Sequence, residues 1–231
     1  MKVIILAGGL GTRIMEETHN KPKPMVEIAG KPILLHIMDI YNKALGCEFK
    51  IAAGYKKEVI EDYMKNVEYD VEIIDTGELT GTGGRIKKIM EMYPLDSFMA
   101  TYGDGLADVN INLLLDFHNS HSRLATVTAV RPAARFGKLK ILDDVVVDFA
   151  EKSQSDEGWI NGGFFVFEPE VKKYISNEME MFEHNPLKKL SQDKQLMAYM
   201  HEKFWQPMDT LREKNDLENL VRIKQAPWLD I

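Results

Sequence analysis

The sequence predicts an α/β fold, a Rossmann-like doubly wound mixed sheet, mostly parallel, in a single domain with a small β-rich region in its second half. Apolar strand-like runs alternate with longer helical patterns through the first half, which is typical of parallel strands joined by crossover helices. The first apolar run, residues 2–7, leads directly into a glycine-rich turn. Beyond residue 120 the apolar runs are separated by short turns, which indicates a mixed β region.

The elements follow in a regular order. Strands are expected at residues 2–7, 49–53, 71–74 and 97–101. Helices are expected at residues 32–45, 56–65, 84–92 and around 111–118. In the second half, strands are expected at 125–130, 138–141, 145–147 and 164–167, with a final helix at 209–221. The helix at 32–45 illustrates the reasoning, because Ile33, Ile37 and Ile40 repeat at helical spacing.

Length and composition limit the classes of function. The 231 residues suit one domain with a sizeable core. A net charge of −7 argues against a nucleic-acid partner bound through a general basic field, so an anionic ligand needs a local site. With a single cysteine, Cys47, no internal disulfide can form, and we expect a packed thiol. No leader or membrane-spanning run is recognisable, so we expect a cytoplasmic protein with no membrane partner.

The turn after the first strand has the features of a phosphate-binding loop. It reads Gly8-Gly9-Leu10-Gly11-Thr12-Arg13, and glycines let consecutive backbone N–H groups turn toward an anion. Arg13 adds a permanent charge in a planar fork. Lys21 and Lys23 follow in a proline-stiffened segment. On these grounds we expect a nucleotide at this turn.

Other glycine loops and an ordinary turn are the alternatives. The dinucleotide pattern would need a glycine at Ile14, and the P-loop would need Gly-Lys-Ser/Thr after four spacer residues. Many α/β domains also open with a strand and a plain glycine turn, so the glycines alone leave nucleotide binding and an ordinary turn equally open. The nearby cationic side chains favour the nucleotide.

Two aspartates are candidates for a metal site. Asp104 stands at a strand end between two glycines, where the backbone can approach a ligand, and Mg²⁺ typically takes one or two protein carboxylates and phosphate oxygens. Asp209 begins the last helical pattern and could be the second ligand. From its position alone, however, Asp209 is better explained as a helix N-cap than as a metal ligand. The pair His118 and His121 is better explained as a solvated helix end than as a metal site.

A second glycine cluster, at 80–85, precedes a helix and ends with Arg85. Backbone there could approach a base or ribose, or it could be an ordinary helix start. Polar residues at 151–152 and 161–163 could contact a second substrate, but each signal is weak alone. There is no Gly-x-Ser-x-Gly turn, so covalent acyl catalysis has no candidate nucleophile.

Several motifs occur together in a fixed order. They are residues 8–13, 21–26, 82–85, 101–105, 135–137, 151–152, 160–165 and 204–212. Over most of the chain this series resembles the sugar-phosphate nucleotidyltransferase superfamily, and within it the branch that transfers a cytidylyl group to glucose 1-phosphate. The resemblance implies that Asp209 is a metal ligand rather than a helix cap. It implies a nucleotide-binding half at 1–120 and an acceptor-binding half at 121–231.

The resemblance implies roles for individual residues, with Mg²⁺ as cofactor and with CTP and a phosphorylated small molecule as partners. Arg13 and Lys23 would be catalytic, and Asp104 and Asp209 would hold Mg²⁺. Residues at the nucleotide would be Leu6, Ala7, Gly8, Gly9, Gly11, Thr12, Arg13, Lys23, Thr82, Gly83, Arg85 and Gly103. Residues at the acceptor would be Gly137, Glu151, Lys152, Asn161 and Trp205, with Lys152 and Arg85 as candidate contacts to the acceptor phosphate or to the nucleotide.

The chain also departs from the family pattern. Only residues 66–74 bridge the second crossover helix and Asp75, where family members resembling it carry a longer insertion, so assembly into a homo-oligomer and the size of the acceptor pocket stay open. Ser153 stands where the family pattern has proline after Glu-Lys. One alternative is therefore the same chemistry on a non-sugar phosphate, such as a phosphorylated amino acid like phosphoglutamine or a polyol phosphate, for surface polysaccharide. Another alternative is a non-catalytic nucleotide-sensing domain.

Overall fold

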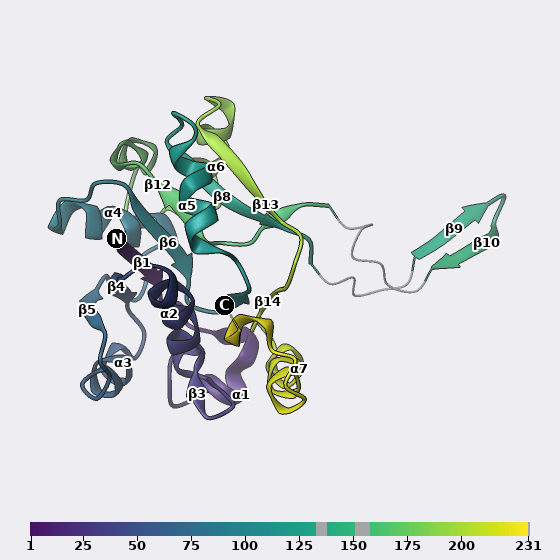
Figure 1. The fold of residues 1–231 in the computed structure, drawn as a ribbon, viewed down its shortest axis with the longest axis horizontal. Helices are drawn as coiled ribbons and strands as arrows, with labels where there is room; N and C mark the ends of the chain where they lie inside the picture. Colours follow the sequence, from purple (N-terminus) through teal and green to yellow (C-terminus); the bar gives the residue numbers. More distant parts are fainter. Residues whose placement is uncertain (133–137, 151–157, 231) are drawn as a thin grey trace.

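A computed structural model of the chain describes residues 1–132, 138–150 and 158–230. One eight-stranded sheet runs through the body of the molecule (Figure 1). Its order is β11 (Ile160–Asn161), β8 (Ala125–Val130), β12 (Phe165–Phe167), β6 (Phe98–Tyr102), β1 (Lys2–Leu6), β4 (Glu48–Ala53) and β5 (Asp70–Asp75), and β13 (Leu196–His201) also pairs with β8. The predicted mixed α/β fold is confirmed, and the expected strand bounds agree closely with these.

The four strands β6, β1, β4 and β5 are parallel, so their carboxyl ends meet at one edge of the sheet. Strand β1 is buried on both faces, and its side chains alternate between two cores. Val3 and Ile5 belong to one apolar cluster, whereas Ile4 and Leu6 belong to the other. This alternation follows from the two-residue period of a strand. A run that is apolar throughout therefore serves both faces of a central parallel strand.

Helices cover both faces of the sheet. The first cluster receives residues of α2 (Ile33–Ala44), α3 (Lys57–Met64), α5 (Ile111–Asn119) and α7 (Leu211–Arg222). The second cluster receives residues of α4 (Thr82–Met92), the 3-10 segment η4 (Pro169–Tyr174) and α6 (Asn185–Gln192). Within the described residues no helix is long and apolar enough to cross a membrane. The arrangement is the doubly wound sheet that the alternating pattern predicts.

The second half contains a strand that the sequence analysis missed. β13 lies parallel to β8 at the sheet edge, with Leu196 opposite Ala125 and His201 opposite Val130. Most of its side chains are partly or fully exposed, because an edge strand has a neighbour on one side only. Its sequence, Leu-Met-Ala-Tyr-Met-His, is apolar but neither alternates nor contains a β-branched residue, so it does not distinguish a strand from a helix. Strands β8 and β12 are antiparallel to each other, as are β12 and β6.

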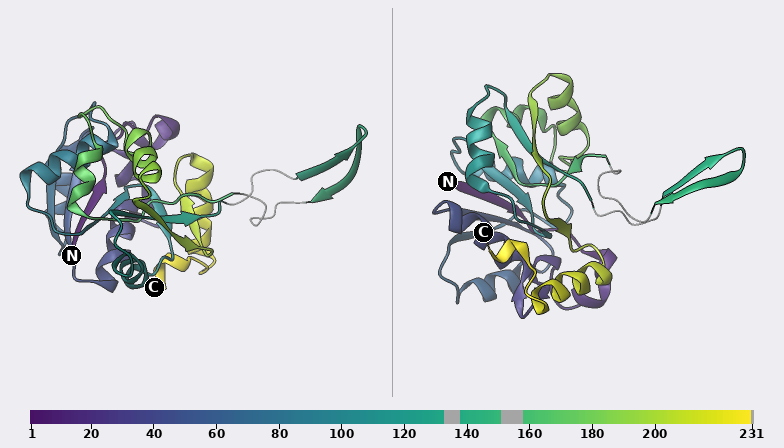
Figure 2. Two further views of the ribbon diagram at one scale, coloured as in Figure 1. Left: turned by 90° about the horizontal axis from the view of Figure 1, so that it is seen from above. Right: turned by 45° about the vertical axis from the view of Figure 1, so that its right-hand side comes forward.

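The expected strands at 138–141 and 145–147 form a hairpin apart from the main sheet. β9 (Lys138–Leu142) and β10 (Val145–Ala150) pair with each other and with no other described strand. The hairpin extends away from the body in all three views (Figures 1 and 2).

The end of the chain packs back on its beginning. β14 (Trp205–Pro207) pairs with β7 (Gly105–Ala107), and α7 lies beside the short elements α1 (Met15–Thr18), β2 (Glu27–Ile28) and β3 (Lys31–Pro32) (Figure 1). The remaining 3-10 segments are η1 (Thr12–Ile14), η2 (Lys23–Met25) and η5 (Pro227–Leu229). Lys214 Nζ lies 2.8 Å from Glu17 Oε1, which ties α7 to α1. An early segment, which carries α1, and a late segment, which carries α7, thus meet beside the carboxyl edge of the parallel strands.

Candidate active site

The glycine loop leaves the end of β1 and turns sharply before η1. Gly11 has a φ of 63°, in the left-handed region that favours glycine. Gly8 is required for another reason, because a Cβ there would overlap the guanidinium of Arg85. A Cβ on Gly9 would meet no atom within 4 Å. The backbone at Gly9 therefore faces open space, whereas the backbone at Gly8 packs against the side chain of Arg85.

Arg85 supports the glycine loop. Its side chain lies under the loop, the residue is only 3% exposed, and its burial lowers its pKa. The guanidinium donates hydrogen bonds to the carbonyl oxygens of Gly8 (3.0 Å), Ala53 (3.0 Å) and Glu78 (3.2 Å), and to the Thr76 hydroxyl. Four of its five N–H groups are thus engaged inside the protein. The glycine turn is held by an arginine that joins the ends of β1, β4 and β5.

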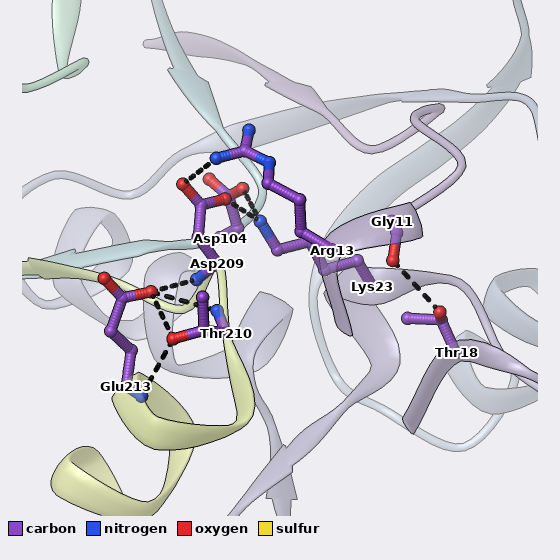
Figure 3. A network of polar contacts seen from close by, with 8 residues as sticks. All are labelled: Gly11, Arg13, Thr18, Lys23, Asp104, Asp209, Thr210 and Glu213. Carbon is purple, nitrogen blue, oxygen red and sulfur yellow. Dashed lines mark hydrogen bonds and ion pairs between the residues drawn. The ribbon is translucent and has the colours of Figure 1, made fainter. Parts of the chain in front are cut away.

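Lys23 joins the two aspartates that the sequence analysis selected. Its Nζ donates to Asp104 Oδ2 and, at 2.6 Å, to Asp209 Oδ1, while Arg13 Nη1 donates to Asp209 Oδ2 at 2.6 Å (Figure 3). Burial alone would lower the pKa of Lys23, but the two carboxylates outweigh it and raise that pKa. Burial would raise the pKa of Asp209, but Lys23 and Arg13 outweigh it and hold that pKa below its ordinary value. Lys23 and Asp209 are therefore both charged near neutral pH.

Asp209 is not the helix N-cap that its position favoured. The cap is Thr210, whose hydroxyl accepts from the Glu213 backbone N–H, while Glu213 Oε2 accepts from the backbone N–H groups of Thr210 and Asp209, both at 2.9 Å (Figure 3). This reciprocal capping box fixes the start of α7. The side chain of Asp209 is therefore free to point at Lys23 and Arg13.

Asp104 follows β6 at the carboxyl edge of the parallel strands. The backbone N–H of Met208 donates to the Asp104 carbonyl at 2.8 Å, which draws the segment before α7 against this turn. The carboxylates of Asp104 and Asp209, more than a hundred residues apart in the sequence, thereby both contact the ammonium group of Lys23. Lys21 does not join them, because its Nζ lies 3.6 Å from Glu27 Oε1.

A cleft of about 550 Å³ opens above these groups. It brings together fifteen of the predicted site residues, namely Leu6, Ala7, Gly8, Gly9, Gly11, Thr12, Arg13, Lys23, Thr82, Arg85, Gly103, Asp104, Asn161, Trp205 and Asp209. Gly83 is not among the lining residues. Gly137, Glu151 and Lys152 lie outside the described residues.

The second glycine cluster approaches protein backbone. A Cβ on Gly84 would overlap the Glu178 carbonyl, and a Cβ on Gly83 would lie 2.9 Å from the Glu180 carbonyl oxygen. The backbone N–H of Gly81 donates to the Glu178 carbonyl at 2.9 Å. The glycines therefore let α4 begin against the segment at 178–182.

The structure adds cleft residues that sequence reasoning missed. They are Ile14, Pro24, Glu78, Thr80, Tyr102, Met181, Glu183 and Pro207. Tyr102 lies next to the Gly103-Asp104 motif and could have been included on that ground. Met181 and Glu183 lie in a polar segment without a motif, and nothing in the sequence alone indicated them.

Histidines play no part in this centre. No group of three His, Cys, Asp or Glu side chains that could hold a metal occurs among the described residues. The expectation of a solvated His118 is wrong, because the residue is 1% exposed and its Nδ1 lies 2.8 Å from the Thr126 hydroxyl. Cys47 is buried, as expected.

The fold and the site together define a class. A doubly wound sheet carries a glycine loop, two cations and two carboxylates at the carboxyl ends of its strands, where such sheets bind phosphorylated ligands. The chain belongs to the nucleotidyl transferase family, whose family model, described as "Nucleotidyl transferase", matches residues 2–231. It is thus a nucleotidyltransferase enzyme.

Individual relatives are similar along nearly the whole chain. Glucose-1-phosphate cytidylyltransferase of Salmonella typhimurium strain LT2 is 46% identical over 253 residues, covering 99% of this chain and 98% of the relative. A probable glucose-1-phosphate cytidylyltransferase of Bacillus subtilis strain 168 is 37% identical and covers 99% of both chains. Among solved structures, HddC from Yersinia pseudotuberculosis complexed with GMP-PN superposes with a TM-score of 0.73 at 25% identity, covering 95% of this chain and 99% of HddC.

Proposed function

We propose that this protein is a Mg²⁺-dependent cytidylyltransferase that joins CTP and glucose 1-phosphate, giving a CDP-linked sugar and pyrophosphate. The observation that carries the proposal is the charged centre at the mouth of the glycine loop, where Lys23 contacts both Asp104 and Asp209. The choice of CTP and of glucose 1-phosphate rests on the similarity to the Salmonella and Bacillus relatives.

The reaction needs no protein nucleophile. A phosphate oxygen of glucose 1-phosphate attacks the α-phosphorus of CTP in line, the bond from that phosphorus to the bridging oxygen breaks, and pyrophosphate leaves with the bonding pair. The protein's task is to align two anions and to neutralise the charge that develops on the phosphorus oxygens. Lys23 and Arg13 supply positive charge at the loop, and the backbone of residues 8–11 supplies N–H donors.

The two aspartates suit a hard divalent cation. Mg²⁺ binds through one or two carboxylates and completes its octahedron with water and phosphate oxygens, and Asp104 and Asp209 offer that number and type of oxygen. When bound, Mg²⁺ would neutralise the phosphate oxygens as a Lewis acid. The contacts that hold Asp209 at the end of the capping box would keep its carboxylate in reach of the cation.

A second acceptor class is favoured by one observation. The alignment with the Salmonella relative spans 253 positions, whereas this chain has 231 residues, so the relative has residues without a counterpart here. A shorter chain can build a different acceptor pocket from the same scaffold. A non-sugar phosphate, such as a phosphorylated amino acid or a polyol phosphate, is therefore the second candidate.

The test is pyrophosphate release with CTP, Mg²⁺ and a panel of phosphorylated sugars, polyols and amino acids, with the product identified by mass. Turnover restricted to glucose 1-phosphate supports the first candidate, and turnover restricted to a non-sugar phosphate supports the second. Absence of turnover with every acceptor would leave only the nucleotide-sensing alternative.

A pair of lysine variants connects the activity to this centre. Lys23→Met should lower turnover roughly 10²–10³-fold, the usual effect of removing one charge-stabilising contact. Lys21→Met is the matched control, because Lys21 lies two residues from Lys23 in the sequence but pairs with Glu27, and its loss should leave turnover within about twofold. Equal losses in both variants would argue against the assigned role of Lys23.

A further inference from the structure

A series of polar side chains runs along one wall of the cleft. Thr82 begins α4, Tyr102 ends β6 and Asn161 ends β11, and all three line the cleft together with Glu183. The Thr82 hydroxyl accepts from the Phe182 backbone N–H at 2.8 Å and donates to Glu183 Oε2 at 2.6 Å. At the other end, Asn161 Nδ2 donates to the Tyr102 hydroxyl oxygen at 2.9 Å.

The two ends of this series each have an unused group. Glu183 Oε1 is buried and accepts no hydrogen bond from the described residues. The other unused group is the hydroxyl proton of Tyr102, whose hydroxyl interacts with the Glu183 carboxylate. Since the Tyr102 oxygen already accepts from Asn161, its proton is what remains to be donated. The buried carboxylate oxygen needs a donor, and the Tyr102 hydroxyl beside it has a proton to donate.

Asn161 is fixed from both sides. Its Oδ1 accepts from the Gly163 backbone N–H at 2.9 Å, and one of its Nδ2–H groups goes to Tyr102. The amide therefore has a single orientation, with oxygen toward the backbone and nitrogen toward the tyrosine. The second Nδ2–H has no partner among the described residues, and Asn161 faces the cleft.

We propose that Tyr102 and Glu183 are positioning residues, which orient Asn161 so that its second Nδ2–H donates to a hydroxyl of the acceptor substrate. Glu183 accepts a hydrogen bond from the Tyr102 hydroxyl, so Tyr102 presents only its oxygen to Asn161. Thr82 holds Glu183 from the far side. This inference rests on the proposed function in one respect, which is that the acceptor carries a hydroxyl near its phosphate.

Steady-state kinetics test the proposal in the full-length protein. Tyr102→Phe keeps the ring, which packs edge-on against Phe165, and removes only the hydroxyl. We expect a rise of about tenfold in the KM for the acceptor, the effect of losing roughly one well-placed hydrogen bond, while the KM for CTP stays within twofold. Tyr174→Phe is the matched control, because it removes a hydroxyl bonded to Asp193 outside the cleft. An unchanged acceptor KM, or an equal rise in both KM values, would overturn the proposal.

A second measurement is independent of turnover. The side-chain amide signals of Asn161 can be identified in a ¹⁵N–¹H spectrum as those absent from Asn161→Asp. Glu183→Gln should shift these signals in the wild-type protein and should leave them unchanged in the Tyr102→Phe background, because the effect passes through the hydroxyl. No shift in either background would overturn the positioning role. A failure of the wild-type protein to use glucose 1-phosphate would instead contradict the proposed function, and the spectra would still decide the role of Glu183.

Discussion

At the residue scale, the two cationic side chains of the charged centre differ in their exposure to solvent. The side chain of Lys23 is 12% exposed, whereas that of Arg13 is 73% exposed, although both donate to Asp209. An ion pair open to water contributes little to stability because solvent screens it. The mostly buried Lys23 is held more strictly, since removing it would leave two carboxylates without their shared cation. Arg13 is therefore the member of the centre that is free to follow a ligand.

The Asp209→Asn variant separates the contribution of Asp209 to turnover from its contribution to stability. The neutral amide keeps the shape of the side chain and removes its charge, so we expect turnover to fall roughly 10²–10³-fold. The fold should persist, because Lys23 keeps Asp104 as its partner. Turnover and the urea midpoint should be measured together, with Asp193→Asn as a control outside the cleft. A fall in turnover that only follows a loss of folded protein would contradict the assignment.

At the scale of elements, the glycine loop, β4 and β5 depend on one arginine. Arg85 donates to carbonyl oxygens at the ends of the strands, so its four hydrogen bonds fix the shape of the loop before any ligand binds. Preorganised N–H donors cost no reorganisation when the anion arrives. The price of this arrangement is a strict requirement for glycine at position 8.

Two alanine variants in the loop should behave differently. Gly8→Ala would displace the Arg85 guanidinium and should lower the free energy of unfolding by about 1–3 kcal/mol, since buried carbonyl groups lose their donors. Gly9→Ala meets no atom within 4 Å and should change stability by less than about 0.5 kcal/mol. Its methyl group projects toward the nucleotide in the proposed complex, so CTP affinity should fall. Urea unfolding and calorimetric CTP titration measure the two effects, and equal stability of both variants would contradict this account.

Several elements could be predicted from the sequence because each carries a local period or motif. Strand β1 and helix α2 are strongly patterned, and the loop at 8–13 has a composition that few turns share. Strand β13 was not predicted because its short apolar run has no alternation and no β-branched residue, so a helix and a strand fit it equally well. The packing role of Gly84 could not be predicted, since it depends on the distant Glu178 carbonyl. Glu183 lies in the cleft through the same tertiary contact, and no local pattern indicates it.

At the scale of the whole molecule, the end of the chain is inserted into its first half. Trp228 is 1% exposed, stacks on Phe204 and donates from Nε1 to His36 Nδ1 at 3.4 Å. His36 Nε2 lies 3.0 Å from the Ile28 carbonyl oxygen, which it reaches as a donor. With one ring nitrogen accepting and the other donating, the imidazole is neutral. The last helix is thereby fixed against the segment that carries Lys23.

The neutral state of His36 predicts a pH dependence of stability. Burial lowers its pKa from 6.5, aided by Lys31 and opposed by the Ile28 carbonyl, Asp39 and Glu218. The unfolded chain therefore binds more protons than the folded protein, so this contribution is complete above about pH 6.5 and is lost as the pH falls below it. Urea unfolding between pH 7 and pH 5 should show a steeper loss of stability for the wild-type protein than for His36→Gln. Equal slopes would contradict a role for His36.

The distance along the sequence between the partners of the charged centre bears on how the protein is made. Lys23 and Asp209 are 186 residues apart, and Arg13 and Asp209 are 196 apart. A ribosome adding about 5–20 residues per second completes β1, the glycine loop and α2 many seconds before Asp209 is translated. During that interval Lys23 has neither Asp209 nor the final helix beside it, although the strands that carry Asp104 can already pair. The parallel strands β1, β4, β5 and β6 can therefore pair before Asp209 is translated, whereas the charged centre forms only after it.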